Sequence, residues 1–300
     1  MTAAAIPLAD GIRPAWRRLD EAERAREYSP SSKAPDFRAI LSHYRARSGA
    51  ALLHLPPPTL LRCGAEAAQR IVLFEPADGA ADVLVVYFHG GYWQELSLDD
   101  SLFPAVDFID RRVAYAAVGY TLAPHATLRQ IVDQAANAVS ALRRFTDAPR
   151  MSSPRIVIAG SSAGAHLAAM LLTLDWGARA SSTPPFDGAI LLSGIYDLRP
   201  LVGTYINEAL QLDEREAFDL SPQYRPLRTQ VPVTVCWGEH ETDEFRRQSR
   251  NLVGRLARGG LLCSAGEIPG RNHFDLVFDL GAAGTLLDRR IAPLLGHDKR

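Results

Sequence analysis

From about residue 70 onward, short runs of apolar and β-branched residues alternate with longer stretches of helical periodicity. Several of these runs are apolar on both faces, which is typical of strands buried in a mostly parallel sheet. The alternation predicts an α/β fold, with a mostly parallel open sheet flanked by helices on both faces. The predicted strands cover residues 70–76, 82–88, 111–120, 155–160, 188–194, 231–238 and 261–270. The predicted helices cover residues 127–145, 163–175, 243–258 and 281–295.

The first 60 residues have a different, polar and mixed texture. Charge pairing over residues 17–26 predicts one helix, and an amphipathic period over residues 36–49 predicts a second that ends at Gly49. A chain of 300 residues fits one large α/β domain. We therefore expect residues 1–300 to form a single domain, with residues 1–60 as a helical arm packed on it.

Composition and charge argue against several classes of function. The formal net charge is −1, so neither nucleic acid nor an anionic membrane is expected as the main partner. The N-terminus is a poor signal peptide and no apolar segment is long enough to span a bilayer, so we expect a soluble, cytoplasmic protein. The three cysteines lie far apart, which predicts no disulfide framework and no metal site, and Cys236 and Cys263 are expected to be buried, inert thiols.

The segment Gly160–Gly164 reads GSSAG and stands between a predicted strand and a predicted helix. This is a G-x-S-x-G pattern in the strand–turn–helix context that a nucleophile elbow requires. The central serine of such an elbow sits on a sharp, strained turn, with its hydroxyl exposed above the sheet. The pattern predicts Ser162 as a catalytic nucleophile. Ser161 is the competing serine, although its place in the motif would point it elsewhere.

The segment HGGYW follows the strand predicted at residues 82–88, upstream of the elbow. Hydrolases built around such an elbow hold the oxyanion with backbone amides from this loop and from the residue after the nucleophile. The predicted donors are Gly90, Gly91 and Ala163, because glycine lets the backbone approach a substrate oxygen closely. His89 precedes the nucleophile in the chain, so we expect it to brace its own loop rather than act as the base.

The general base is expected on a loop after the last strand, where GEIPGRNHF supplies His273. The acid is expected after the preceding strand, and it commonly falls three residues beyond the glycine that ends that strand, which points to Glu241. Asp243 remains an alternative because aspartate is the commoner acid, although it could instead cap the next helix. The chain order Ser162, Glu241, His273 is that of the α/β-hydrolase fold, which is the predicted fold class.

Several segments together resemble the kynurenine formamidase family, also called arylformamidases, of the α/β-hydrolase type. They are EYSPSS, HGGYW, GYTLAPHATLRQIVDQ, GSSAGAHLA, LSGIYDLRPL, GEHETDEFRRQS and NHFDLV. The resemblance implies hydrolysis of N-formyl-L-kynurenine to L-kynurenine and formate, the second step of tryptophan breakdown, without metal or cofactor. It also implies Ser162 as nucleophile, His273 as base and Glu241 as acid, where relatives carry aspartate.

An aryl amine leaving group would need an apolar wall beside the oxyanion loop. Tyr92, Trp93 and Tyr196 are the predicted substrate-binding residues for this purpose. Simple core packing remains an equal alternative for Trp93. The expected partner is a small-molecule substrate, and the sequence does not choose between a monomer and a homodimer. The alternative functions are a general carboxylesterase for small acyl or aryl esters and a non-catalytic binding protein with a hydrolase fold.

Overall fold

A computed structural model of the chain describes residues 15–77, 79, 81–147, 153–179 and 183–296. Within these residues, eight strands form one sheet. They are β1 (Thr59–Arg62), β2 (Arg70–Phe74), β3 (Val83–Phe88), β4 (Ala114–Val118), β5 (Arg155–Ser161), β6 (Gly188–Leu192), β7 (Val233–His240) and β8 (Leu262–Asn272). The sequence therefore predicted every strand except β1.

The strands lie in the order β1-β2-β4-β3-β5-β6-β7-β8. Strand β2 is antiparallel to both β1 and β4, and all other neighbours are parallel. The central strands β3, β4 and β6 are buried along their whole length, which explains their continuous apolar sequences. The predicted mostly parallel α/β sheet is thus confirmed.

The α-helices of the described residues precede, connect and follow these strands. They are α1 (Glu21–Glu27), α2 (Phe37–His54), α3 (Pro104–Ile109), α4 (Leu128–Thr146), α5 (Ala163–Leu171), α6 (Asn207–Leu210), α7 (Glu214–Asp219), α8 (Asp243–Arg258) and α9 (Leu286–Leu295). The prediction that the second helix ends at Gly49 was wrong. Gly49 faces open space and costs a helix only about 1 kcal/mol, so α2 continues until Leu55, the residue before Pro56, turns extended.

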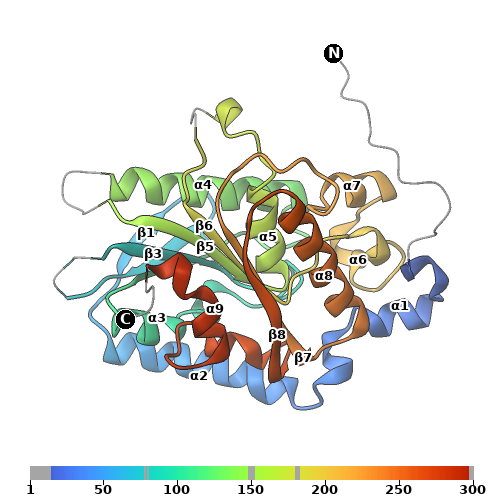
Figure 1. The fold of residues 1–300 in the computed structure, drawn as a ribbon, viewed down its shortest axis with the longest axis horizontal. Helices are drawn as coiled ribbons and strands as arrows, with labels where there is room; N and C mark the ends of the chain where they lie inside the picture. The colour runs from blue at the N-terminus through green and yellow to red at the C-terminus, as the bar shows by residue number, and fades with distance from the viewer. Residues whose placement is uncertain (1–14, 78, 80, 148–152, 180–182, 297–300) are drawn as a thin grey trace.

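Helices cover both faces of the sheet (Figure 1). Helices α4, α5 and α8 pack on one face, where their apolar side chains join those of the strands in a single buried cluster. Helices α2, α3 and α9 pack on the other face around a second cluster. Helix α4 begins with a capping box, in which the Thr127 and Gln130 side chains each accept from the other's backbone amide. This arrangement confirms the predicted fold class.

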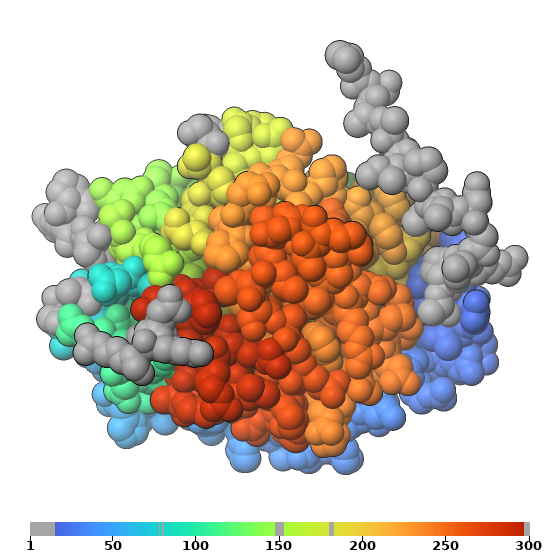
Figure 2. All heavy atoms as spheres, in the orientation of Figure 1, coloured from blue at the N-terminus to red at the C-terminus, as the bar shows by residue number. Residues whose placement is uncertain are grey.

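The N-terminal helices lie against elements from the C-terminal part of the chain. In Figure 2 the blue N-terminal residues run beneath the red and orange C-terminal elements and reach the right-hand edge of the molecule. The Tyr44 hydroxyl of α2 donates to the carbonyl oxygen of Phe274. The Thr242 hydroxyl donates to the carbonyl oxygen of Glu27 at 2.6 Å. Residues 27–44 are therefore packed against the loops that follow β7 and β8.

No helix within the described part of the chain is both long enough and apolar enough to cross a membrane.

Candidate active site

The turn from β5 into α5 has the geometry of a strained elbow. Ser162 adopts φ 56° and ψ −118°, a backbone conformation that side-chain-bearing residues rarely adopt. The flanking glycines make this turn possible, because a Cβ on Gly160 would lie 2.3 Å from the backbone of Gly164. A Cβ on Gly164 would lie 1.9 Å from the carbonyl oxygen of Phe88. The elbow therefore brings Ser162 against the loop that follows β3.

The residues predicted to supply the oxyanion donors belong to two segments next to Ser162. A Cβ on Gly90 would be 3.3 Å from the Cβ of Ser162, so the loop backbone passes directly beside the serine. Gly91 adopts φ +91°, and its carbonyl oxygen accepts the amide of Glu95 at 2.9 Å in a tight turn. Ala163 is the first residue of α5, so its amide has no acceptor within the helix. Gly90 and Gly91 thus line the same cavity as Ser162, and Ala163 follows the serine directly at the start of α5.

His89 lies in the interior and supports the HGGYW loop. Its ring stacks on Tyr120 with centroids 4.2 Å apart, and its Nδ1 lies 2.9 Å from the carbonyl oxygen of Gly90. The Tyr120 hydroxyl also donates to the carbonyl oxygen of His89 at 2.8 Å. Burial lowers the pKa of His89 to about 4, so the ring is neutral near pH 7. These contacts agree with the expected bracing role.

The ends of β7 and β8 bring Glu241 and His273 together. The two strands are parallel, and His240 pairs with Asn272 at their carboxyl ends. Glu241 is the first residue after β7, and His273 is the first residue after β8. Glu241 Oε2 lies 3.3 Å from His273 Nδ1. Glu241 is only 4 % exposed and His273 only 5 %. The two residues predicted to act as acid and base are thus hydrogen-bonded and shielded from solvent.

Two further groups hold the Glu241 carboxylate in place. Its Oε1 accepts the Ser193 hydroxyl at 2.5 Å and the amide of Gly238 at 2.6 Å. Because Oε1 is occupied in this way, Oε2 is left for His273. Sequence reasoning missed Ser193, although the segment LSGIYD that contains it was already notable. Its role depends on a contact across 48 residues of chain that no local pattern reveals.

The alternative acid, Asp243, faces solvent. It is the first residue of α8, its side chain is 91 % exposed, and it lies 3.6 Å from Arg246 one turn along the helix. The N-cap position is taken by Thr242. Asp243 therefore has the environment of an exposed carboxylate at a helix N-terminus.

A cavity of about 280 Å³ opens beside the elbow. Ser162 and His273 line it, together with Gly90 and Gly91. Seven aromatic residues from separate parts of the chain also line it: Phe37, Tyr44, Tyr87, Tyr92, Phe103, Tyr205 and Phe274. This volume lies just below the usual range for small-molecule sites, roughly 300–1,000 Å³, so the cavity suits a small ligand.

Two of the three side chains expected beside a substrate are instead buried in the core. Trp93 is fully buried and packs edge-on against His166 with centroids 4.8 Å apart. Tyr196 is also fully buried, and its ring folds back over Gly194, where a Cβ would meet it at 2.3 Å. Neither residue is among those that line the cavity, whereas Tyr92 is. This placement does not support direct contact of Trp93 or Tyr196 with a substrate.

One of the two cysteine predictions was wrong. Cys236 is buried, and burial raises the pKa of its thiol to about 12. Cys263 is exposed because β8 is the edge strand of the sheet and is only half covered. Among the described residues, no group of three or more His, Cys, Asp or Glu side chains could hold a metal ion.

The lowered pKa values of two buried histidines, His89 and His166, predict how stability depends on pH. Burial lowers the pKa of His89 and of His166 to about 4, from an ordinary value of 6.5. Between these values the unfolded chain binds protons that the folded chain does not, so stability must fall as the pH falls from 6.5 toward 4. Each histidine contributes up to about 1.4 kcal/mol per pH unit in that window.

Urea unfolding at a series of pH values measures this slope. His166→Gln is expected to reduce the slope by the share of one histidine, whatever its effect on stability at pH 7. An identical slope in the variant and the parent would show that His166 binds protons as readily in the folded protein as in the unfolded chain.

Comparison with known proteins defines the class first. A profile of the α/β-hydrolase fold family matches residues 85–276, which include the elbow, the HGGYW loop, Glu241 and His273. The solved structure of a candidate thioesterase from a Silicibacter species is similar, with a TM-score of 0.78 and 26% identity, over 88% of this chain and 97% of that one. An esterase from Mycobacterium marinum shares the fold with a TM-score of 0.65 at 21% identity, over 94% of this chain and 95% of its own. The chain is a member of the α/β-hydrolase fold family.

Comparison with proteins of known function narrows the family further. The kynurenine formamidase of Danio rerio is 33% identical over 294 residues, which is 94% of this chain and 98% of that protein. The kynurenine formamidase of Salmo salar is 32% identical over the same shares of the two chains. The protein of that name from Drosophila melanogaster is 31% identical over 65% of this chain and 67% of its own. The chain belongs to the kynurenine formamidase family.

Proposed function

We propose that this protein hydrolyses the formyl amide of N-formyl-L-kynurenine, giving L-kynurenine and formate, with Ser162, His273 and Glu241 as its catalytic triad. Kinship with the kynurenine formamidases supports the reaction. The observation that carries the mechanism is the buried Glu241–His273 hydrogen bond, since His273 lines the same cavity as the strained Ser162.

In the first step, His273 takes the proton of the Ser162 hydroxyl as the serine oxygen attacks the formyl carbon. Glu241 fixes the ring through Nδ1 and stabilises the imidazolium that forms. No hydrogen bond joins the Ser162 hydroxyl to His273 among the described contacts, and such bonds often tighten only when substrate is present. The amides of Ala163 and Gly91, with Gly90 beside them, would hold the oxyanion, and one such donor is typically worth about 3 kcal/mol.

The tetrahedral intermediate then breaks its carbon–nitrogen bond. The His273 imidazolium gives its proton to the departing aryl amine, which leaves as L-kynurenine, while the formyl group stays on the Ser162 oxygen. Water then loses a proton to His273 and attacks the formyl carbon, so formate is released and the serine recovers its proton. Each proton that His273 accepts is returned in the same half-reaction.

The cavity is suited to an aromatic amine with a small acyl group. The Phe37 and Phe274 rings lie 5.4 Å apart and form an apolar wall next to His273. Tyr92 and Tyr205 add aromatic surface with polar hydroxyl groups. We therefore assign the aryl-binding role to these cavity residues in place of Trp93 and Tyr196. The cytoplasmic location and the lack of a required metal or cofactor stay predictions, and both a monomer and a homodimer stay open.

A comparison of two substrates tests the proposed specificity. We expect kcat/KM for N-formylkynurenine to exceed that for p-nitrophenyl acetate, although the ester has the better leaving group, because the aryl amine and its amino-acid tail fill the cavity. The measurement is steady-state kinetics of both substrates on one enzyme preparation. If the ester turns over far better than the formamide, the protein is a general carboxylesterase with the same triad.

A further inference from the structure

The segment around Tyr28 connects the arm to the loop that carries the proposed oxyanion donors. Tyr28 follows α1 directly and is fully buried. Its carbonyl oxygen accepts the Tyr92 hydroxyl at 2.6 Å. Tyr92 is the residue after Gly91, so this hydrogen bond ties the position of the oxyanion loop to the backbone of the arm.

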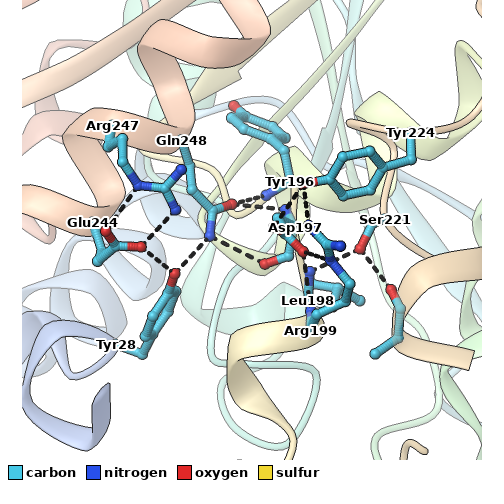
Figure 3. Close-up of polar contacts among 11 residues, drawn as sticks. Tyr28, Tyr196, Asp197, Leu198, Arg199, Ser221, Tyr224, Glu244, Arg247 and Gln248 are labelled. Carbon is cyan, nitrogen blue, oxygen red and sulfur yellow. Dashed lines mark hydrogen bonds and ion pairs between the residues drawn. The ribbon is translucent and has the colours of Figure 1, made fainter. Parts of the chain in front are cut away.

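The same segment holds the residues that follow the proposed acid. The Tyr28 hydroxyl donates to Glu244 Oε2 at 2.5 Å (Figure 3). The Thr242 hydroxyl donates to the Glu27 carbonyl oxygen at 2.6 Å, and the Glu244 amide donates to the Glu27 carboxylate at 3.2 Å. These bonds begin one residue after Glu241. The arm therefore contacts the segment just after Glu241 as well as the loop that carries the proposed oxyanion donors.

Gln248 extends this connection to the other support of Glu241. Its side-chain amide donates to the Tyr28 hydroxyl and to the Asp197 carbonyl oxygen, both at 3.1 Å. Its Oε1 accepts the amides of Tyr196 and Asp197 at 2.6 and 2.7 Å (Figure 3). Tyr196 and Asp197 belong to the loop that begins just after Ser193, and the Ser193 hydroxyl donates to Glu241 Oε1. The segment that follows Glu241 and the loop that follows Ser193 are therefore both linked to Tyr28.

Burial and the neighbouring charges keep the Tyr28 hydroxyl protonated, and Arg247 keeps Glu244 paired. Arg247 binds both oxygens of Glu244, at 2.8 and 2.6 Å, so the buried carboxylate is paired. Burial, followed by the negative charge of Glu244, raises the pKa of the Tyr28 hydroxyl well above its usual value. The phenol therefore stays a donor near neutral pH. A buried polar network in which each group has a partner is rigid and holds its attached loops in one arrangement.

We propose that Tyr28 is a positioning residue for catalysis, which sets the spacing between the oxyanion loop and the loops that hold Glu241. The inference rests on the proposed function, because it assigns catalytic roles to Ser162, His273 and Glu241. Tyr28 does not touch the reacting atoms. It acts through Tyr92 on one side and through Glu244 and Gln248 on the other, so its loss should slow the chemical step more than it weakens substrate binding.

Tyr28→Phe tests the proposal by deleting one hydroxyl. We expect about a tenfold lower kcat for N-formylkynurenine with KM changed less than about twofold, because small shifts of catalytic groups are costly to the rate. The rate at which a fluorophosphonate labels Ser162 should fall by a similar factor. The labelling rate does not depend on the natural substrate. A parent enzyme that labels readily but leaves N-formylkynurenine intact would thus refute the proposed function while still testing Tyr28.

Tyr28→Phe in a second enzyme background, Glu241→Gln, separates a positioning role from a general effect on stability. If Tyr28 acts largely through Glu241, the Tyr28→Phe effect on labelling should shrink to less than about threefold in a Glu241→Gln enzyme. Tyr115→Phe is the matched control, since Tyr115 is also fully buried and its hydroxyl donates to a carbonyl oxygen, that of Ser101, at 2.7 Å. It should lower the urea midpoint without changing the labelling rate.

Two results would overturn the proposal. One is a labelling rate and kcat in Tyr28→Phe equal to those of the parent. The other is a full tenfold effect in the Glu241→Gln background. If Tyr28→Phe does not fold, Tyr92→Phe removes the link to the Tyr28 carbonyl from a partly exposed ring. It should then slow labelling several-fold, and an unchanged rate would count against the proposal.

Discussion

Replacing Ser162 with alanine is expected to lower kcat for N-formylkynurenine by about 10⁵- to 10⁶-fold. The loss is this large because the proposed reaction passes through a covalent formyl-serine, and His273 and Glu241 have no nucleophile to activate without it. The proposed oxyanion donors, Gly91 and Ala163, remain, so hydrolysis should persist above the uncatalysed rate. Steady-state kinetics with a direct assay for L-kynurenine gives the measurement.

Active-site labelling controls for this result. A fluorophosphonate should modify the parent enzyme at Ser162 and leave Ser162→Ala unmodified. Ser161 also lines the cavity, so Ser161→Ala should be made in parallel. If labelling survives in Ser162→Ala and is lost in Ser161→Ala, the nucleophile has been assigned to the wrong serine.

Glu241→Gln is expected to lower kcat by roughly 10⁴-fold with little change in KM. The glutamine can still accept the Ser193 hydroxyl and the Gly238 amide, so the loop should keep its shape. What is lost is the negative charge that lies 3.3 Å from His273 Nδ1 and stabilises the imidazolium in the transition state. Steady-state kinetics and a urea unfolding curve together separate this loss from a folding defect.

Asp243→Asn is the matched control for that substitution. It makes the same chemical change two residues away, on a side chain that is 91 % exposed and pairs only with Arg246 in the described contacts. Its kcat should stay within about twofold of the parent, since exposed pairs of this kind contribute little. The reverse pattern, with Asp243→Asn inactive and Glu241→Gln active, would transfer the role of the acid to Asp243.

The fold could be predicted where periodicity and burial agree. The buried strands have continuous apolar sequences, and each was found within a few residues of its bounds. Strand β1 was missed because it lies at the sheet edge, where its residues are partly or fully exposed and its sequence TLLR is short. The short helices α3, α6 and α7 were missed because none exceeds 6 residues, too few for a period to show.

The sequence could predict those candidate site residues whose place at the end of a strand indicates their chemical role. Ser162, Glu241 and His273 follow three different strands of a parallel sheet, and the carboxyl ends of such strands share one edge. The rest depends on contacts between distant parts of the chain. Tyr28 reaches Glu244 across 216 residues, and the aromatic pair Phe37 and Phe274 joins the arm to the last loop. For Trp93 the sequence left substrate contact and core packing as equal alternatives, because its place beside the HGGYW loop does not show which way the ring turns, and the structure places it in the core.

The most direct test of the central claim is product release from N-formylkynurenine by the parent enzyme and Ser162→Ala, assayed side by side. We expect one formate for each L-kynurenine, with a parent kcat/KM above about 10⁴ M⁻¹ s⁻¹ and a near-complete loss in the variant. A parent enzyme that released no L-kynurenine, or a variant that released it at the rate of the parent, would contradict the proposed serine-dependent hydrolysis.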